Sequence, residues 1–303
     1  MLRLLTMRTA LPILRTAMLA LACMACVGCN DSGAPTAAST QPAAQEDTET
    51  APADPAPIEG NVITRNLPRF NDAFESDRAF LQWQTTFYQH KQFDRLPEAI
   101  GYYTSSDLYH DETGRVPMAA FFGAALAQSD AAIDDCYNEL MLEGRDSELI
   151  TLGYSIWLAD TPHARATMVQ AREVWQSEKL IRLLRTIERT KRQRTIDRNF
   201  EDSRVIYMLS SEFFANGDEA TLRKIISVAH MHNAPEDTWQ RFAGQGATIV
   251  LRGLLPNHPM VRRIVEDEAA NNPSTPVRTH MNILLKEAGF LKERPGTDDP
   301  AGS

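Results

Sequence analysis

Apolar residues recur at helical spacing along most of the chain, from about residue 61 to residue 291. After Ser76, for example, apolar side chains occupy positions 80, 81, 83, 87 and 88. Positions three and four apart lie on one face of an α-helix, so this spacing is typical of amphipathic helices that bury one side. We therefore predict an all-α fold, either an α-solenoid or an irregular helical bundle of antiparallel helix pairs.

Residues that begin and end helices separate these apolar stretches. Ser, Thr and Asp are favoured immediately before a helix, Pro at its first position, and Gly just after its end. The predicted caps or starts are Ser76, Leu96, Val116, Ser129, Asp146, Thr161-Pro162, Asp218, Pro235 and Thr275-Pro276, and the predicted stops include Gly144 and Gly289.

Four successive predicted helices begin at even intervals. Their first residues are Val116, Ala131, Ser147 and Pro162, which gives a helix-pair period of about 31 residues. This length and alternation resemble those of tetratricopeptide-like arrays, in which each helix pair buries a face by stacking on its neighbours. The resemblance implies an array of helix pairs, and an irregular bundle of evenly sized helices is the alternative.

The N-terminal segment has the features of a secretory leader. Arg3, Arg8 and Arg15 precede an uncharged run that extends from Thr16 to Gly28. A helix needs about 20 apolar residues to span a bilayer, so this run is too short for that role. A basic region followed by a short apolar one is typical of a signal peptide, here residues 1–28. Translation from either Met1 or Met7 preserves these features.

The leader ends in the sequence Cys26-Val27-Gly28-Cys29-Asn30. It resembles the lipobox of bacterial lipoproteins, in which a small residue precedes a Cys that is acylated and becomes the mature N-terminus. Cys26 departs from the pattern, because that family usually carries Leu there. The resemblance implies that Cys29 carries palmitate-type chains, with Cys23 and Cys26 as rival sites. In Gram-negative lipoproteins, a residue other than Asp after that Cys favours the outer membrane.

Composition divides the remainder into three parts. Residues 30–60 contain eight Ala, five Pro and six acids, with no base and one large aliphatic side chain. Such a segment cannot bury enough apolar surface to offset its ordering entropy, so residues 29–60 are predicted to be a lipidated Cys and a disordered tether. Residues 61–293 form the predicted helical domain, and residues 294–303 a disordered tail.

Charge is distributed unevenly along the chain. The whole sequence carries −9, and removal of a leader with three arginines and no acid leaves −12, which argues against a general nucleic-acid binder. Residues 179–198 nevertheless carry eight bases against two acids, beside an apolar helical stripe. We expect either a solvated face that balances the acidic remainder, or a docking surface for an anionic partner. The candidate docking residues are Arg182, Arg185, Arg189, Lys191, Arg192 and Arg194.

Aromatic residues are concentrated near the start of the domain, where residues 70–122 hold 12 of the 23. Packing in the core is the first interpretation. The group Tyr102, Tyr103 and Tyr109 lies near a predicted loop, so a groove for peptide or glycan is the alternative.

Few residues point to catalysis, a cofactor or a metal. His230 and His232 are two positions apart and do not face one way on a helix, so we interpret them as histidines at a helix C-terminus. Gly244-Gln245-Gly246 lacks the third glycine and the preceding strand of a dinucleotide fingerprint. Cys136 lies beside carboxylates, which raise a thiol pKa, and is predicted to be a buried, inert thiol.

The sequence thus predicts a lipid-anchored periplasmic protein with no catalytic residues, no cofactor and no metal. The leading hypothesis is a helical scaffold or adaptor with a protein partner in envelope assembly or secretion, attached to the bilayer through Cys29. An enzyme or binding protein that acts on cell-wall glycan is the alternative.

Overall fold

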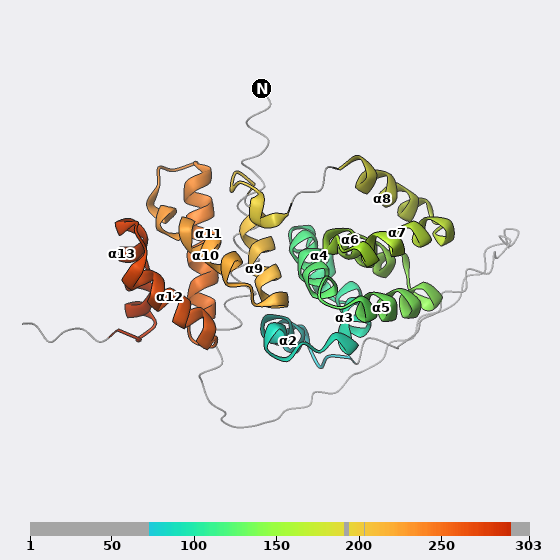
Figure 1. Cartoon of the computed structure of the whole chain (residues 1–303), viewed down its shortest axis with the longest axis horizontal. Helices are drawn as coiled ribbons and strands as arrows, with labels where there is room; N and C mark the ends of the chain where they lie inside the picture. The colour runs from blue at the N-terminus through green and yellow to red at the C-terminus, as the bar shows by residue number, and fades with distance from the viewer. Residues whose placement is uncertain (1–72, 191–193, 203, 292–303) are drawn as a thin grey trace, which may run out of the picture.

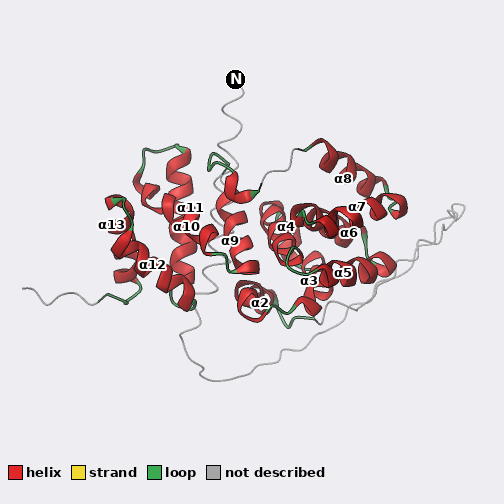
Figure 2. Cartoon of the chain, in the orientation of Figure 1, coloured by secondary structure: helices red, strands yellow, loops and turns green. Residues whose placement is uncertain are grey.

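The structure, a computed structural model, describes residues 73–190, 194–202 and 204–291 (Figures 1 and 2). Those ranges contain 12 α-helices with short 3-10 segments between them and no strand, which confirms the all-α prediction. The helices are α2 (Asp77–His90), α3 (Leu96–Ser105), α4 (Glu112–Leu126), α5 (Asp130–Glu143), α6 (Asp146–Ala159), α7 (Pro162–Val174), α8 (Glu178–Arg189), α9 (Arg204–Asn216), α10 (Glu219–Ala229), α11 (Trp239–Leu254), α12 (Pro259–Asn271) and α13 (Thr275–Glu287).

Several helices begin where their local sequence predicts. Ser76, Ser129, Thr161 and Asp218 each accept a hydrogen bond from a backbone N–H two or three residues ahead. Such a bond satisfies one of the four backbone donors that the first turn of a helix leaves without a partner. These caps are therefore confirmed.

Helix α4 begins four residues before the predicted Val116. The carboxylate of Asp111 accepts a hydrogen bond from the backbone N–H of Thr113 at 3.0 Å and caps the helix about one turn earlier. Pro117 consequently lies inside the helix and not at its first position.

Two other predicted starts also differ from the structure. Helix α11 begins at Trp239 and not at Pro235, because Thr238 supplies the capping oxygen. Asp146 is the first residue of α6 and not its cap, which is Arg145.

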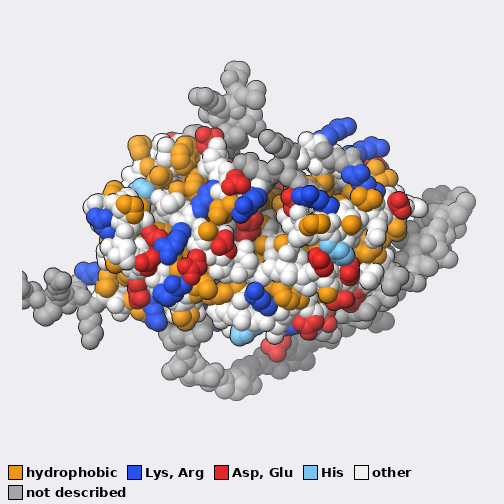
Figure 3. Space-filling model, in the orientation of Figure 1, with side chains coloured by type: hydrophobic (Ala, Val, Ile, Leu, Met, Phe, Trp, Pro, Cys, Tyr) orange, Lys and Arg blue, Asp and Glu red, His pale blue; other side chains and the backbone are white. Residues whose placement is uncertain are grey.

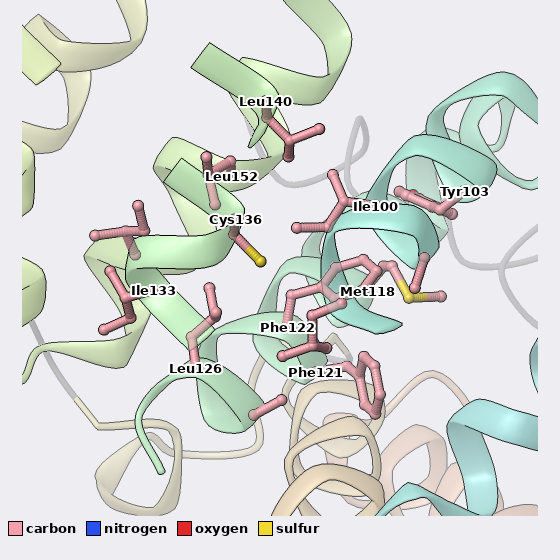
Figure 4. Close-up of a cluster of buried hydrophobic side chains, with 14 of the residues drawn as sticks. Ile100, Tyr103, Met118, Phe121, Phe122, Leu126, Ile133, Cys136, Leu140 and Leu152 are labelled. Carbon is pink, nitrogen blue, oxygen red and sulfur yellow. The ribbon is translucent and has the colours of Figure 1, made fainter. Parts of the chain in front are cut away.

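The first hydrophobic cluster lies among α2–α8, around the aromatic face of α4 (Figure 4). Phe121 and Phe122 are fully buried there. The Phe121 ring lies edge-on to Trp83 and Phe87, at centroid distances of 5.7 and 5.5 Å. Such pairs add to the stabilisation from burial of their area. Cys136 of α5 is fully buried in the same cluster, as the sequence predicts.

The second hydrophobic cluster lies among α9–α13. Each of the last four helices contributes fully buried side chains, among them Ile226, Leu251, Ile264 and Leu284. Ion pairs across the surface link the same helices. For example, the guanidinium of Arg223 on α10 pairs with Asp267 at 2.9 Å and with the buried Glu268, both on α12.

Helix α9 joins the two clusters, because it packs against α4 and α2 as well as α10 (Figure 1). Phe214 contacts both clusters. The Gln128 amide after α4 donates to the carbonyl of Ala215 at 3.0 Å, and the Tyr88 hydroxyl lies 3.1 Å from His258 Nδ1. A strictly serial array has contacts only between neighbouring repeats, and the packing of α4 on α9 departs from that pattern.

The even spacing is nevertheless present in part. Helices α5, α6, α7 and α8 begin at positions 130, 146, 162 and 178, so the step between successive starts is constant. The step from Glu112 of α4 to Asp130 of α5 is slightly longer, because Asp111 begins α4 early.

The predicted signal peptide (1–28), tether (29–60) and tail (294–303) lie outside the described residues. Among the residues described, no helix is both long and apolar enough to cross a bilayer.

Candidate functional site

Helix α8 is the strongest candidate site, and its sequence explains how it is held. The Ser177 hydroxyl accepts from the backbone N–H of Leu180 at 3.3 Å and caps the helix. Leu180, Leu184 and Ile187 are buried, and α8 packs with this side on α6. Positions i, i+4 and i+7 form one stripe, so the opposite side of the helix faces away from the fold.

Three arginines occupy that opposite side. Arg182, Arg185 and Arg189 are spaced three and four residues apart, so their side chains share one face, and all three are exposed. Figure 3 shows Lys and Arg side chains gathered over α8. We call Arg182, Arg185 and Arg189 the basic stripe.

Neighbouring acids neutralise little of the basic stripe. Arg182 pairs with Glu178 at 2.9 Å, but both side chains are highly exposed, at 76% and 87%. Within the part of the chain that the structure describes, no ion pair involves Arg185 or Arg189. A pair as exposed as Arg182–Glu178 contributes only about 0.2–1 kcal/mol. Among the described residues, short ion pairs with acids of the fold therefore account for little of the charge of the basic stripe.

The structure separates Arg194 from the basic stripe. Arg194 precedes the 3-10 segment η6 (Thr195–Asp197) and lies near Glu212 of α9. Burial raises the pKa of Glu212, while a hydrogen bond from Thr195 and the charges of Arg198 and Arg194 act in the opposite direction. Arg194 is exposed, and its charge acts on the half-buried Glu212 of α9. Lys191 and Arg192 lie outside the described residues.

The ammonium of Lys224 on α10 contacts the segment that contains η6 and the residues just after it. It donates to the backbone carbonyls of Ile196 and Arg198 and lies 5.2 Å from the centre of the Phe200 ring. Desolvation lowers its pKa. These contacts fasten η6 to the bundle.

Two members of the aromatic group, Tyr102 and Tyr103, lie in the first hydrophobic cluster. Tyr102 and Tyr103 are buried, and both rings stack on Phe80 in the core. Tyr109 is half-buried, edge-on to Tyr103 and beneath the guanidinium of Arg115. The ring faces are occupied by protein, so the core interpretation holds for Tyr102 and Tyr103.

A pocket of about 300 Å³ nevertheless lies beside Tyr102, between α2 and the end of α3. Its lining is polar: Asp77, Ser105, Ser106 and Asp107 join the tyrosine. The Tyr102 hydroxyl donates to Asp77 at 2.9 Å, and burial followed by this bond raises its pKa to about 12. No sequence signal pointed to this pocket, because Asp77 and Asp107 are far apart in the chain.

The histidine pair gains a third member that sequence spacing does not reveal. His280 of α13 lies with its ring centre 4.3 Å from that of His232, and its Nε2 lies 3.0 Å from the Thr248 hydroxyl. His230 and His232 sit in the 3-10 segment η7 (His230–Asn233) that follows α10, as predicted for a helix C-terminus. In the described ranges, no three His, Cys, Asp or Glu side chains are arranged to hold a metal ion.

The two cysteines of the predicted mature chain cannot be compared, because Cys29 lies outside the described residues. Burial, followed by the charges of Asp135 and Glu139, raises the pKa of the Cys136 thiol. A thiol in this state is a poor nucleophile.

No protein-family model matches the chain, and no curated protein or solved structure matches it significantly.

Proposed function

We propose that this chain is a lipid-anchored, helical interaction module of a bacterial cell envelope, on the periplasmic face of the outer membrane. In this role the acylated Cys29 holds the protein on the bilayer, and the helical domain acts as a scaffold or adaptor in envelope assembly or secretion. The basic stripe of α8 is its docking face for an anionic partner, and no catalysis is involved.

One observation carries the proposal: the basic stripe is exposed, and two of its three arginines have no ion pair among the described residues. Such a guanidinium is available to a carboxylate or phosphate, and its planar fork matches either group with two hydrogen bonds. Three of them in one row on a rigid helix make a surface that favours polyanionic partners.

Charge reversal tests this role directly. We expect the R185E/R189E variant to lose an anionic partner that is recovered with the wild type by crosslinking in intact cells. Because neither arginine pairs with a described residue, the melting temperature should change little. The matched control is R78E/K91E, which reverses two exposed bases on and just after α2 and should keep the partner. Recovery of every wild-type partner by R185E/R189E would contradict the docking role.

The anchor is tested separately. Replacement of Cys29 by Ala should prevent acylation and processing, so the chain remains an unprocessed precursor. The wild type should partition with membranes and carry acyl chains by mass spectrometry, because two or more chains give stable attachment whereas one gives marginal attachment. A wild-type mature chain without lipid would refute the anchor.

The polar pocket beside Tyr102 favours a second candidate function, the binding of cell-wall glycan. Carboxylates and hydroxyls such as Asp77, Asp107 and Ser106 can bond the hydroxyls of a sugar. Calorimetric titration with soluble peptidoglycan fragments, repeated on D107N, tests this candidate. Binding that D107N abolishes would support it, and no heat of binding would exclude it.

A further inference from the structure

We propose that the basic stripe of α8 docks on the phosphate headgroups of an anionic phospholipid bilayer. This inference rests on the proposed function and names the partner of the same surface. The acyl anchor and the stripe would then be two independent membrane contacts of one chain.

The first argument is the shape of the stripe. Arg182 and Arg189 are two helical turns apart on α8, so the three guanidinium groups follow one another over about 10 Å along the helix axis. Lys179, in the first turn, is 72% exposed and makes only a long contact of 3.6 Å to Asp146. A linear row of long, exposed cations suits a flat layer of phosphates.

The second argument is that the described outer face of α8 carries no large exposed apolar side chain. Within the described ranges the large exposed apolar side chains are Val169, Val174, Trp239, Ile283 and Leu291. None of them is on α8. Protein–protein interfaces bury a core that is apolar and aromatic and is depleted in charge, and the outer face of α8 offers no such core. Headgroups require only charge and hydrogen-bond donors, so lipid fits this face better than an acidic protein does.

The third argument is proximity. In this arrangement the predicted tether, residues 30–60, joins Cys29 to the helical domain, and a flexible chain of that length has an end-to-end distance on the order of 30 Å. Headgroups are therefore present near the domain at high effective concentration. Each Lys or Arg near an anionic surface strengthens binding roughly fivefold, so a few bases suffice to hold an anchored domain against the bilayer.

Vesicle binding tests the proposal without the anchor. The protein is the chain from Asn30 to Ser303, which lacks Cys29 but keeps every residue of both hydrophobic clusters. Circular dichroism first establishes that each variant is helical and melts in one transition. Co-sedimentation is then measured with vesicles of phosphatidylcholine alone and with vesicles containing about one-third phosphatidylglycerol.

We expect binding to the phosphatidylglycerol vesicles only. R185Q/R189Q should weaken it on the order of 25-fold, from about fivefold for each of two charges. The matched control R78Q/K91Q should change it less than twofold. Binding should also fall steeply between 0.1 M and 1 M NaCl, because the Debye length shrinks from about 10 Å to about 3 Å.

Two results would overturn the inference. One is equal binding to the two kinds of vesicle, and the other is equal binding by the wild type and R185Q/R189Q. If either occurs while R185E/R189E still loses a crosslinked protein in cells, the docking face survives and its partner is an acidic protein. A failed anchor is distinguishable, because it appears only in the fractionation of the Cys29 variant.

Discussion

A fall in pH from 8 to 5 is expected to reduce the free energy of unfolding by about 4 kcal/mol through two buried histidines. His258 and His280 are each less than 5% exposed. Desolvation lowers the pKa of both to about 4, and for His280 the charges of His232, Arg252 and His230 add to that effect. Both histidines therefore have to be neutral in the folded protein.

The sign follows from proton binding. Between about pH 6.5 and pH 4 the unfolded chain binds a proton at each histidine and the folded protein does not. The free energy of unfolding is therefore fully retained above pH 6.5 and decreases as the pH falls toward 4. For a shift from 6.5 to about 4, the loss at pH 5 is about 2 kcal/mol for each histidine.

Among the described residues, no acid raises the pKa of either histidine. The Nδ1 of His258 lies 3.1 Å from the Tyr88 hydroxyl, whose own pKa is raised by burial. The Nδ1 of His280 is buried and has no hydrogen-bond partner among the described residues. The nearest acid on α13, Glu287, is already paired with Arg252.

Urea unfolding at pH 8, 6.5 and 5 measures the effect. The variants H258Q and H280Q should each remove about half of the difference between pH 8 and pH 5, whatever they do to stability at pH 8. The control is H90Q, at an exposed position at the end of α2 that loses little solvation on folding. A pH difference that neither buried substitution reduces would assign the acid sensitivity to other groups.

Alanine is expected to have opposite effects at the two glycines of α11. At Gly244 a Cβ would lie 2.3 Å from the backbone N of His232 and 2.5 Å from the carbonyl carbon of Met231. Those atoms belong to the backbone of η7 and cannot rotate away, so the segment must shift. Gly246 is also buried, but its nearest neighbour is a methyl carbon of Ile206 at 3.6 Å, an ordinary contact.

The expected magnitudes follow from packing and helix propensity. G244A should lower the free energy of unfolding by about 1–3 kcal/mol, the usual cost of overpacking. G246A should raise it by up to about 1 kcal/mol, because alanine favours the helix more than glycine does. Thermal and urea unfolding of the two single variants provide the measurement. Stabilisation by both substitutions would show that η7 does not press on α11 at Gly244, and destabilisation by both would show that the space at Gly246 does not accept a methyl group.

The helix caps show which helix starts can be predicted from the local sequence. Ser129, Thr161 and Asp218 begin helices because each side chain bonds a backbone N–H within three residues, an interaction contained in the local sequence. Where two residues near each other could each begin a helix, the sequence alone did not predict which of them does. Asp111 and Thr238 cap helices for which the predicted starts were Val116 and Pro235.

The sequence likewise predicted which side of α8 is buried. It did not predict which of the exposed arginines have an acidic partner. The apolar stripe of α8 predicted an amphipathic helix, and Leu180, Leu184 and Ile187 are its buried side. Whether the opposite arginines pair with the acidic remainder depends on which acids lie nearby. The fold leaves Arg185 without a described partner and directs Arg194 toward Glu212 on α9.

The sequence by itself determined the helical class, most helix starts and the inert character of Cys136, because each depends on residues a few positions apart. Only the tertiary structure decided that α9 packs on α4, that Tyr103 lies in the core and that His280 meets His232. Those contacts join residues that are far apart in the chain or whose burial depends on distant helices. The spacing of apolar residues specifies which face of a helix is buried, but the partner of that face is set by side-chain fit across the whole bundle.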